Sequence, residues 1–506
     1  MSHRSPATLT PVSGRNAPLE MQPHEFRELG HQLVDTLADF LGSIPERAIT
    51  RGATPAEIRG LLGDGPLPTE GTDAAALISE VTHLLIEHSL LNGHPRFMGY
   101  ITSSAAPIGA LADMLAATVN PNVGAWSLSP MASEIERQTV RWIAEMVGFP
   151  SDCGGLLVSG GNIANFVGVL AARRARLDWD VRTEGLRSSN GRTPLIYTSR
   201  ETHTWVEKAG DLFGFGTNAI RWIPADNELR MDVTELRRQL DADIAAGYQP
   251  FMVVGTAGSV STGAIDPLPA IAEVCREYDL WFHVDGAYGA FAAISPDAPD
   301  DLKGLVLADS LALDPHKWLY SPLEAGCALV REARTLEDTF SFHPSYYHFD
   351  GENDDPPINF INYGMQNSRG FRALKVWLAL RQAGRDGYER MISDDMHLSR
   401  ELHRRVTDHP EFEAFTQELS ISTFRYVPED LATTGNANEE YLNQLNKELL
   451  GRLEADGKVF VSNAVIGGAF VLRACIVNFR TTMSDIDMIP DIIARAGREL
   501  DARNRC

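Results

Sequence analysis

A lysine that follows a short apolar stretch is the first residue whose position suggests chemistry. Lys317 lies in LDPHKWLY, directly after the apolar segment SLAL. An ammonium group beside a buried strand is costly to keep unpaired, and a partly desolvated lysine amine is nucleophilic towards carbonyl carbons. Taken by itself, this position is more typical of a surface lysine in a turn. The lysine therefore becomes informative only together with other residues.

A carboxylate follows a second apolar stretch. Asp285 ends the segment LWFHVD and is followed by the small residues Gly286 and Ala287. A carboxylate in this place can hold a proton on a pyridine nitrogen, and small neighbours let a flat ring approach the backbone. A metal-binding aspartate or a helix cap is the alternative interpretation.

A glycine turn and a histidine follow two further stretches that are typical of strands. In LLVSGGNIANF the N–H groups of Gly160 to Asn162 would begin a helix and form a phosphate cradle. The turn is neither a Walker loop nor G-x-G-x-x-G, so alone it is weak evidence. His203, in SRETHTWVEKAG, lies in a predicted loop between a strand and a helix, where a lone histidine is more often structural.

The order of these four features is more specific than any one of them. A phosphate loop, an aromatic ring, an acid and a lysine follow successive strands of one predicted domain. The ligands of such domains bind beyond the carboxyl ends of the strands. Pyridoxal phosphate has a phosphate, a flat ring, a basic nitrogen and an aldehyde, so it matches all four features.

Strands and helices alternate from residue 94 to residue 374, which predicts an α/β domain with a mostly parallel sheet and helices on both faces. Residues 1–22 read as a flexible arm, and residues 23–93 as amphipathic helices that need a partner surface. Residues 375–506 read as a small α+β domain. We expect its last helix to begin at the capping box Ser484-Asp485-Ile486-Asp487.

The same motifs resemble the group II pyridoxal-phosphate-dependent amino acid decarboxylases, of which the aromatic-L-amino-acid decarboxylases are the best-known members. The resemblance covers nearly the whole chain and is carried by HPRFMGY, NVGAWSLSPMASEIE, SGGNIAN, HVDGAYGA, DPHKW and RGFRALKVW. It implies the fold-type I architecture of pyridoxal phosphate-dependent transferases, with a seven-stranded type of central sheet. It also implies a homodimer that releases an amine and CO2 from an L-amino acid.

The resemblance further implies roles for particular residues. Lys317 would carry the cofactor covalently, Asp285 would bind its ring nitrogen, and His203 would stack on its ring. The implied cofactor-binding set is Gly161, Asn162, His203, Asp285, Ala287, His316 and Lys317.

Three residues are implied on the substrate side, namely Tyr100, Ile101 and Ser368, and Tyr346 would be a catalytic tyrosine on a mobile loop. Tyr347 is the alternative, because the register of that loop is inferred. Ser368 matches a position where plant relatives carry serine with phenolic substrates and glycine with indoles, which favours tyrosine or DOPA.

Some residues depart from the aromatic enzymes. Gly93 and Ile101 stand where animal aromatic decarboxylases tend to have tryptophan and phenylalanine, and Val260 stands near a threonine of the family. A decarboxylase of glutamate or aspartate is therefore an open alternative. So are an aldehyde synthase, an aminotransferase or other lyase of this fold, and a catalytically idle scaffold that binds the cofactor.

Composition excludes several other classes of protein. The 506 residues include 45 Lys plus Arg and 68 Asp plus Glu, a formal net charge of −23 that disfavours nucleic acid and anionic membranes as partners. We expect no membrane span, because the apolar run from Ala105 to Val119 is broken by Asp113. The five cysteines are widely spaced, which argues against a disulfide framework and a metal site and favours a cytoplasmic location.

Overall fold

The computed structural model describes residues 17–186, 191–342, 357–434 and 439–505, with the side chains of 432–434 left out. The chain divides into two compact units, Met1–Leu91 and Asn92–Cys506. The first unit contains the helices α1 (Pro23–Ser43), η1 (Ile44–Glu46), α2 (Pro55–Leu62) and α3 (Ala74–His88). None of the residues described in α1, α2 and α3 is buried, and apolar side chains such as Val34, Leu37 and Val81 are exposed. These helices therefore bury no apolar stripe within their own unit.

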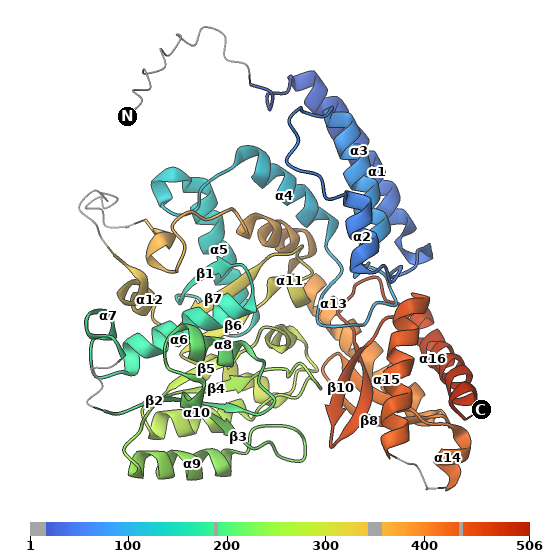
Figure 1. Cartoon of the computed structure of the whole chain (residues 1–506). Coiled ribbons are helices and arrows are strands. Elements are labelled where there is room, and N and C mark those ends of the chain that lie inside the picture. The colour runs from blue at the N-terminus through green and yellow to red at the C-terminus, as the bar shows by residue number, and fades with distance from the viewer. Residues whose placement is uncertain (1–16, 187–190, 343–356, 435–438, 506) are drawn as a thin grey trace, which may run out of the picture. The chain divides into compact units, whose positions relative to one another are not determined.

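A seven-stranded sheet forms the centre of the second unit (Figure 1). Its strands, in spatial order, are β1 (Gly154–Val158), β7 (Gly326–Val330), β6 (Ser310–Leu313), β5 (Trp281–Asp285), β4 (Gln249–Thr256), β2 (Pro194–Ser199) and β3 (Ile220–Ile223). β7 is antiparallel to both of its neighbours, and the other adjacent pairs are parallel. The predicted mostly parallel sheet is confirmed.

Helices cover both faces of this sheet. Successive residues of a strand point to opposite faces, so Val253 packs in one apolar cluster while Met252 and Val254 pack in the other. One face is covered by α5 (Pro130–Met146), α9 (Val233–Ala245) and α10 (Leu268–Glu277), and the other by α6 (Gly161–Arg176) and α8 (Trp205–Leu212). Strands buried on both sides explain why each strand reads as a continuous apolar run.

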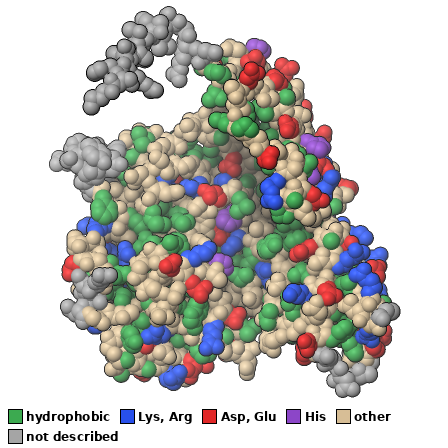
Figure 2. Space-filling model, viewed as in Figure 1, with side chains coloured by type: hydrophobic (Ala, Val, Ile, Leu, Met, Phe, Trp, Pro, Cys, Tyr) green, Lys and Arg blue, Asp and Glu red, His purple; other side chains and the backbone are tan. Residues whose placement is uncertain are grey.

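A four-stranded antiparallel sheet lies in the C-terminal part of the chain. Its order is β10 (Ser462–Ile466), β11 (Ala469–Cys475), β9 (Ile421–Tyr426) and β8 (Phe412–Glu418). Its helices are α13 (Ala373–Asp408), α14 (Glu429–Thr434), α15 (Glu439–Asp456) and α16 (Met483–Asn504). Acidic and basic side chains are mixed over this part of the surface (Figure 2). The expected start of the last helix was wrong: its N-cap is Thr482, because the backbone N–H and the hydroxyl of Thr482 both donate to Asp485 Oδ2, at 3.0 and 2.7 Å.

Short helices connect the larger elements. They are α4 (Pro107–Val119), η2 (Trp126–Leu128), α7 (Val181–Glu184), η4 (Thr217–Ala219), η5 (Gly289–Ile294), η6 (Asp300–Leu307), α11 (Pro315–Trp318), α12 (Ala333–Phe340) and η7 (Phe360–Asn362). Within the described residues, none of the helices has both the length and the apolar character needed to cross a membrane.

A buried ion pair joins the edge of the large sheet to its covering helix. Arg369 and Glu136 are 1% and 0% exposed at their side chains. Arg369 also donates to the carbonyl oxygens of Val123 (3.0 Å) and Leu157 (2.6 Å), and Glu136 accepts the N–H of Leu157 at 2.8 Å. Both charges are therefore desolvated but hydrogen-bonded, so either one would be left uncompensated without the other.

We expect Glu136→Gln to lower the free energy of unfolding by about 3–5 kcal/mol, because it leaves the Arg369 charge buried and unpaired. Urea denaturation followed by circular dichroism measures this change. The matched control is Glu145→Gln on the same helix, which breaks an exposed pair with Arg141 and should cost less than about 1 kcal/mol. Equal effects of the two substitutions would contradict this account of the buried pair.

Candidate active site

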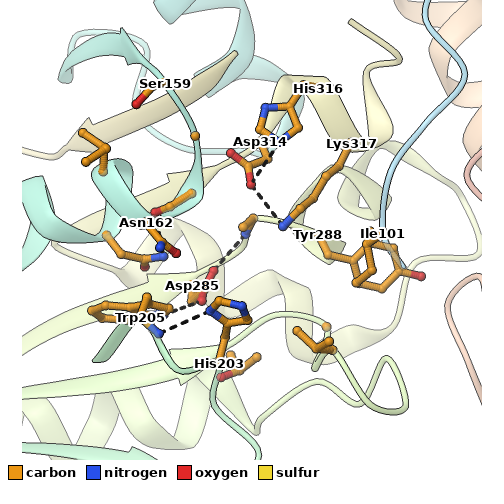
Figure 3. Close-up of a pocket in the computed structure, with 18 of the residues that line it drawn as sticks. Ile101, Ser159, Asn162, His203, Trp205, Asp285, Tyr288, Asp314, His316 and Lys317 are labelled. Atoms are coloured by element: carbon orange, nitrogen blue, oxygen red, sulfur yellow. Dashed lines mark hydrogen bonds and ion pairs between the residues drawn. The ribbon is translucent and has the colours of Figure 1, made fainter. Parts of the chain in front are cut away.

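A cavity of about 360 Å³ lies at the carboxyl ends of the central strands. Parallel strands bring the residues that follow them to one edge of the sheet, so segments far apart in the sequence meet there (Figure 3). The residues that line the cavity are Ile101, Ser159, Gly160, Gly161, Asn162, Ile163, Asn165, His203, Trp205, Thr256, Gly258, Val260, Asp285, Ala287, Tyr288, Asp314, His316, Lys317 and Glu324.

Lys317 lies on α11, just beyond β6, and its amine forms an ion pair with a buried carboxylate. The distance from its Nζ to Asp314 Oδ2 is 3.0 Å, and the side chain of Asp314 is 3% exposed. The other oxygen of Asp314, Oδ1, is buried and has no hydrogen-bond partner among the described residues. His316 lies 3.7 Å from Asp314, and burial lowers the pKa of His316 although the carboxylate opposes this. The lysine is thus held at the cavity wall by its own short helix.

Asp285 is the last residue of β5 and is 8% exposed. The indole N–H of Trp205 donates to its Oδ2 at 2.7 Å, and the backbone N–H of Ala287 donates to its Oδ1 at 3.1 Å. A carboxylate has about four acceptor positions, so positions remain for a donor in the cavity.

His203 lies in the loop between β2 and α8, near Asp285 in the close-up of Figure 3. Its Nδ1 accepts the backbone N–H of Trp205 at 3.3 Å. Burial lowers the pKa of His203, and the charge of Lys317 acts in the same direction against the pull of Asp285. A neutral ring whose Nδ1 accepts a hydrogen bond carries its proton on Nε2.

The glycine turn after β1 leaves room for an anion at the start of α6. Gly160 has φ 157° and ψ 179°, a conformation that side chains disfavour, and a Cβ on Gly161 would lie 2.7 Å from Asp314 Oδ2. The N-terminus of α6 has no side-chain cap, so its first N–H groups are available to a phosphate. Both glycines are thus explained by backbone shape and space.

The structure brings most of the predicted residues together. The predicted cofactor set and Ile101 all line the cavity, as does Val260. Tyr100 and Ser368 do not line it: Tyr100 is 54% exposed, and Ser368 is also exposed. Tyr346 and Tyr347 lie outside the described residues.

Several lining residues were not predicted. Asp314 stands three residues before Lys317, a spacing that puts two side chains on one face of a helical turn and could have indicated the ion pair. Trp205 stands two residues after His203, but a tryptophan at the start of an amphipathic helix is usually a core residue. Tyr288 lies in the motif HVDGAYGA, which could have indicated it, whereas Glu324 carried no signal that separates it from other glutamates.

The site fits pyridoxal phosphate. A phosphate fits the N–H groups at the start of α6, a ring nitrogen fits the free acceptor positions of Asp285, and an aldehyde carbon fits the amine of Lys317. Within the described residues, no cluster of three or more His, Cys, Asp or Glu side chains that could hold a metal ion occurs. The fold and this cavity define a pyridoxal phosphate-dependent enzyme.

Comparisons with known proteins show which pyridoxal phosphate-dependent enzymes this chain resembles. The pyridoxal-dependent decarboxylase conserved domain matches residues 56–427. The chain is 32% identical over 489 residues to an aromatic-L-amino-acid decarboxylase of Bacillus atrophaeus, covering 96% of this chain and 98% of that one. It is 28% identical to tyrosine decarboxylase 4 of Petroselinum crispum, covering 93% and 92%.

Among solved structures, the TDC of Oryza sativa with PLP and tryptamine has a TM-score of 0.87 at 27% identity, covering 96% of this chain and all of that chain. The chain therefore belongs to the pyridoxal-dependent decarboxylase family. It is a lyase that uses pyridoxal phosphate to decarboxylate an amino acid.

Borohydride reduction of the purified, cofactor-loaded protein is expected to fix the cofactor on one peptide, the one that contains Lys317. Peptide mass spectrometry locates the label. Lys317→Ala should abolish it, whereas Lys208→Ala, a change to a second lysine near His203, should keep it. A label on any other lysine would show that the covalent site has been misassigned.

Proposed function

We propose that this enzyme converts an aromatic L-amino acid of the phenolic type, tyrosine or DOPA, to its amine and CO2. The observation that carries the proposal is the convergence of Lys317, Asp285, His203 and the start of α6 on one cavity. The two relatives named above act, by their names, on aromatic amino acids, which supports the substrate class.

The residues of the chain hold and orient the reacting groups. Lys317 binds the cofactor through its amine, and Asp314 keeps that amine at the cavity wall. The N–H groups of Gly161 and Asn162 bind the phosphate with help from His316, and His203 and Ala287 flank the ring. Asp285 holds the proton on the ring nitrogen. When bound, pyridoxal phosphate supplies a ring that accepts the electrons of the broken bond between Cα and the carboxylate.

The proton that returns to Cα needs a donor on the substrate side of the cavity. We assign this role to Tyr346, because a phenol with its usual pKa near ~10 is protonated at neutral pH. Prompt proton delivery to Cα would give the amine, whereas slow delivery would allow dioxygen to oxidise the substrate at Cα to an aldehyde, with release of ammonia and hydrogen peroxide. A tyrosine proton donor at position 346 thus favours amine as the product, as in a decarboxylase, over aldehyde, as in an aldehyde synthase. Tyr347 is the second candidate for the same role.

The enzyme is proposed to act as a homodimer. Apolar side chains on α4 are exposed, among them Leu111 and Leu115, as are those on α1 and α3. Exposed apolar side chains gathered on one helix are typical of a protein–protein interface, and each of the two units carries such helices. Ser368 and Tyr100 are exposed and do not line the cavity, and in the proposed dimer a second subunit packed against them would complete a substrate pocket. A cytoplasmic location stays a prediction, consistent with the four described cysteines, which are free.

We expect tyrosine or DOPA to be turned over with a higher kcat/KM than tryptophan. The hydroxyl of Ser368 adds bulk and a hydrogen-bonding group, which suits a phenol and disfavours the larger indole. Amine release from the twenty amino acids, DOPA and 5-hydroxytryptophan measures the preference. Ser368→Gly should shift it towards tryptophan, by about ten-fold for a contact worth ~1.4 kcal/mol. Faster turnover of tryptophan, or of glutamate or aspartate, would overturn the phenolic assignment.

Tyr346→Phe is expected to keep cofactor binding and CO2 release but to divert product from amine to aldehyde, ammonia and hydrogen peroxide. Mass spectrometry of the products and a peroxide assay measure this. Tyr347→Phe is the matched control and should leave amine as the product. Amine formation at an undiminished rate by the Tyr346 variant would remove its role as the proton donor. If the wild type releases hydrogen peroxide in stoichiometric amounts with CO2, the enzyme is an aldehyde synthase and the proposed decarboxylation to the amine is wrong.

A further inference from the structure

Trp205 bonds two residues of the proposed function, His203, which flanks the cofactor ring, and Asp285, which holds the proton on its ring nitrogen. Its indole N–H donates to Asp285 Oδ2 at 2.7 Å, and its backbone N–H donates to Nδ1 of His203 at 3.3 Å. The side chain is 1% exposed, so its indole N–H has no water to bond with in place of the carboxylate. Figure 3 shows both bonds, with Asp285 and His203 lying close together beside Trp205.

A second set of hydrogen bonds keeps the indole ring of Trp205 in place. The ring packs edge-to-face against His283, with ring centroids 5.9 Å apart and an interplanar angle of 79°. His283 is fully buried, and its Nε2 lies 2.7 Å from Asn165 Oδ1, while its Nδ1 lies 2.7 Å from Ser310 Oγ. Burial lowers the pKa of His283 to about 4, so the ring is neutral at pH 7.

The directions of these bonds follow from the partners at each end. The amide nitrogen of Asn165 donates to the carbonyl oxygen of Gly161 at 2.9 Å, so its Oδ1 faces His283 and accepts from Nε2. Nδ1 of the neutral ring therefore accepts from the Ser310 hydroxyl, whose oxygen accepts the indole N–H of Trp281 at 2.8 Å. Every polar group of this layer is satisfied, which fixes its geometry.

We propose that Trp205 is a positioning residue that holds the Asp285 carboxylate towards the ring nitrogen of the cofactor and presents His203 in a single orientation. The inference rests on the proposed roles of Asp285 and His203. A carboxylate with one donor on each oxygen cannot rotate freely, and its remaining acceptor positions face the cavity. Without the indole N–H, Oδ2 would lose its fixed direction and could turn away from the ring nitrogen.

The test compares two buried tryptophans of the same layer. Trp205→Phe removes the N–H that bonds Asp285 and keeps an aromatic ring and the backbone bond to His203. Trp281→Phe removes a similar N–H, the one that donates to Ser310, and leaves the bond from Trp205 to Asp285 in place, so it serves as the matched control. Asp285→Asn reports whether Asp285 itself holds the proton on the ring nitrogen.

Two measurements other than activity are used. The first is the 15N signal of ring-labelled pyridoxal phosphate in the loaded proteins, which reports the protonation of the ring nitrogen directly. The second is the dissociation constant of the cofactor from titration of the cofactor-free proteins. For Trp205→Phe we expect a partial shift of the 15N signal towards the unprotonated form and about ten- to a hundredfold weaker cofactor binding, as for loss of a hydrogen bond to a charged group. A fall in kcat with KM nearly unchanged should accompany them.

Trp281→Phe should match the wild type in the 15N signal. If Trp205→Phe keeps the wild-type 15N signal and cofactor affinity while Asp285→Asn loses the protonated signal, the proposed role of Trp205 is overturned and that of Asp285 stands. Equal losses in both tryptophan variants would also overturn it, since they would reflect the packing of the layer. A protonated signal that persists in Asp285→Asn would instead overturn the proposed role of Asp285. If Trp205→Phe does not fold, replacing Trp205 by benzothienylalanine, which has sulfur in place of the N–H at nearly the same shape, tests the same bond.

Discussion

A carboxylate buried at the end of a central strand must be held by hydrogen-bond donors, and the arrangement of the whole site depends on how Asp285 meets this requirement. Its two bonded donors, Trp205 and the N–H of Ala287, come from the start of α8 and from the turn after β5. The two hydrogen bonds to this carboxylate thus fix the position of the loop that carries His203 and of the turn against which a flat ring can pack. The same contacts that make burial tolerable also leave acceptor positions directed into the cavity.

The phosphate cradle is tied to the same strand through helix α6. Asn165 on α6 bonds both the carbonyl of Gly161 and the ring of His283, which stands two residues before Asp285 on β5. A Cβ on Gly168 would lie 2.5 Å from the His283 ring, so the helix and the strand pack closely at this point. The separation between the anion site and the carboxylate is therefore held by buried, fully bonded groups, as a rigid cofactor that spans both requires.

The strands, and the convergence of Lys317, Asp285 and His203, could be predicted because parallel strands bring the residues after them to one edge of the sheet. Long-range polar pairings could not. The bond from Trp205 to Asp285 joins residues 80 positions apart, and Arg369, which reads as part of a family motif, is a buried partner of Glu136. Such pairs are set by tertiary packing, which leaves no period in the sequence. The antiparallel placement of β7 between β1 and β6 escaped prediction for the same reason.

The central claim is that one cavity holds pyridoxal phosphate through Lys317, Asp285 and the start of α6, and a structure of the loaded enzyme tests it most directly. We expect density that joins the Lys317 amine to the aldehyde carbon of the cofactor. The ring nitrogen should lie within about 2.6–3.2 Å of the Asp285 carboxylate, and the phosphate should contact the N–H groups of Gly161 and Asn162. A cofactor bound through another lysine, or with its ring nitrogen turned away from Asp285, would contradict the account.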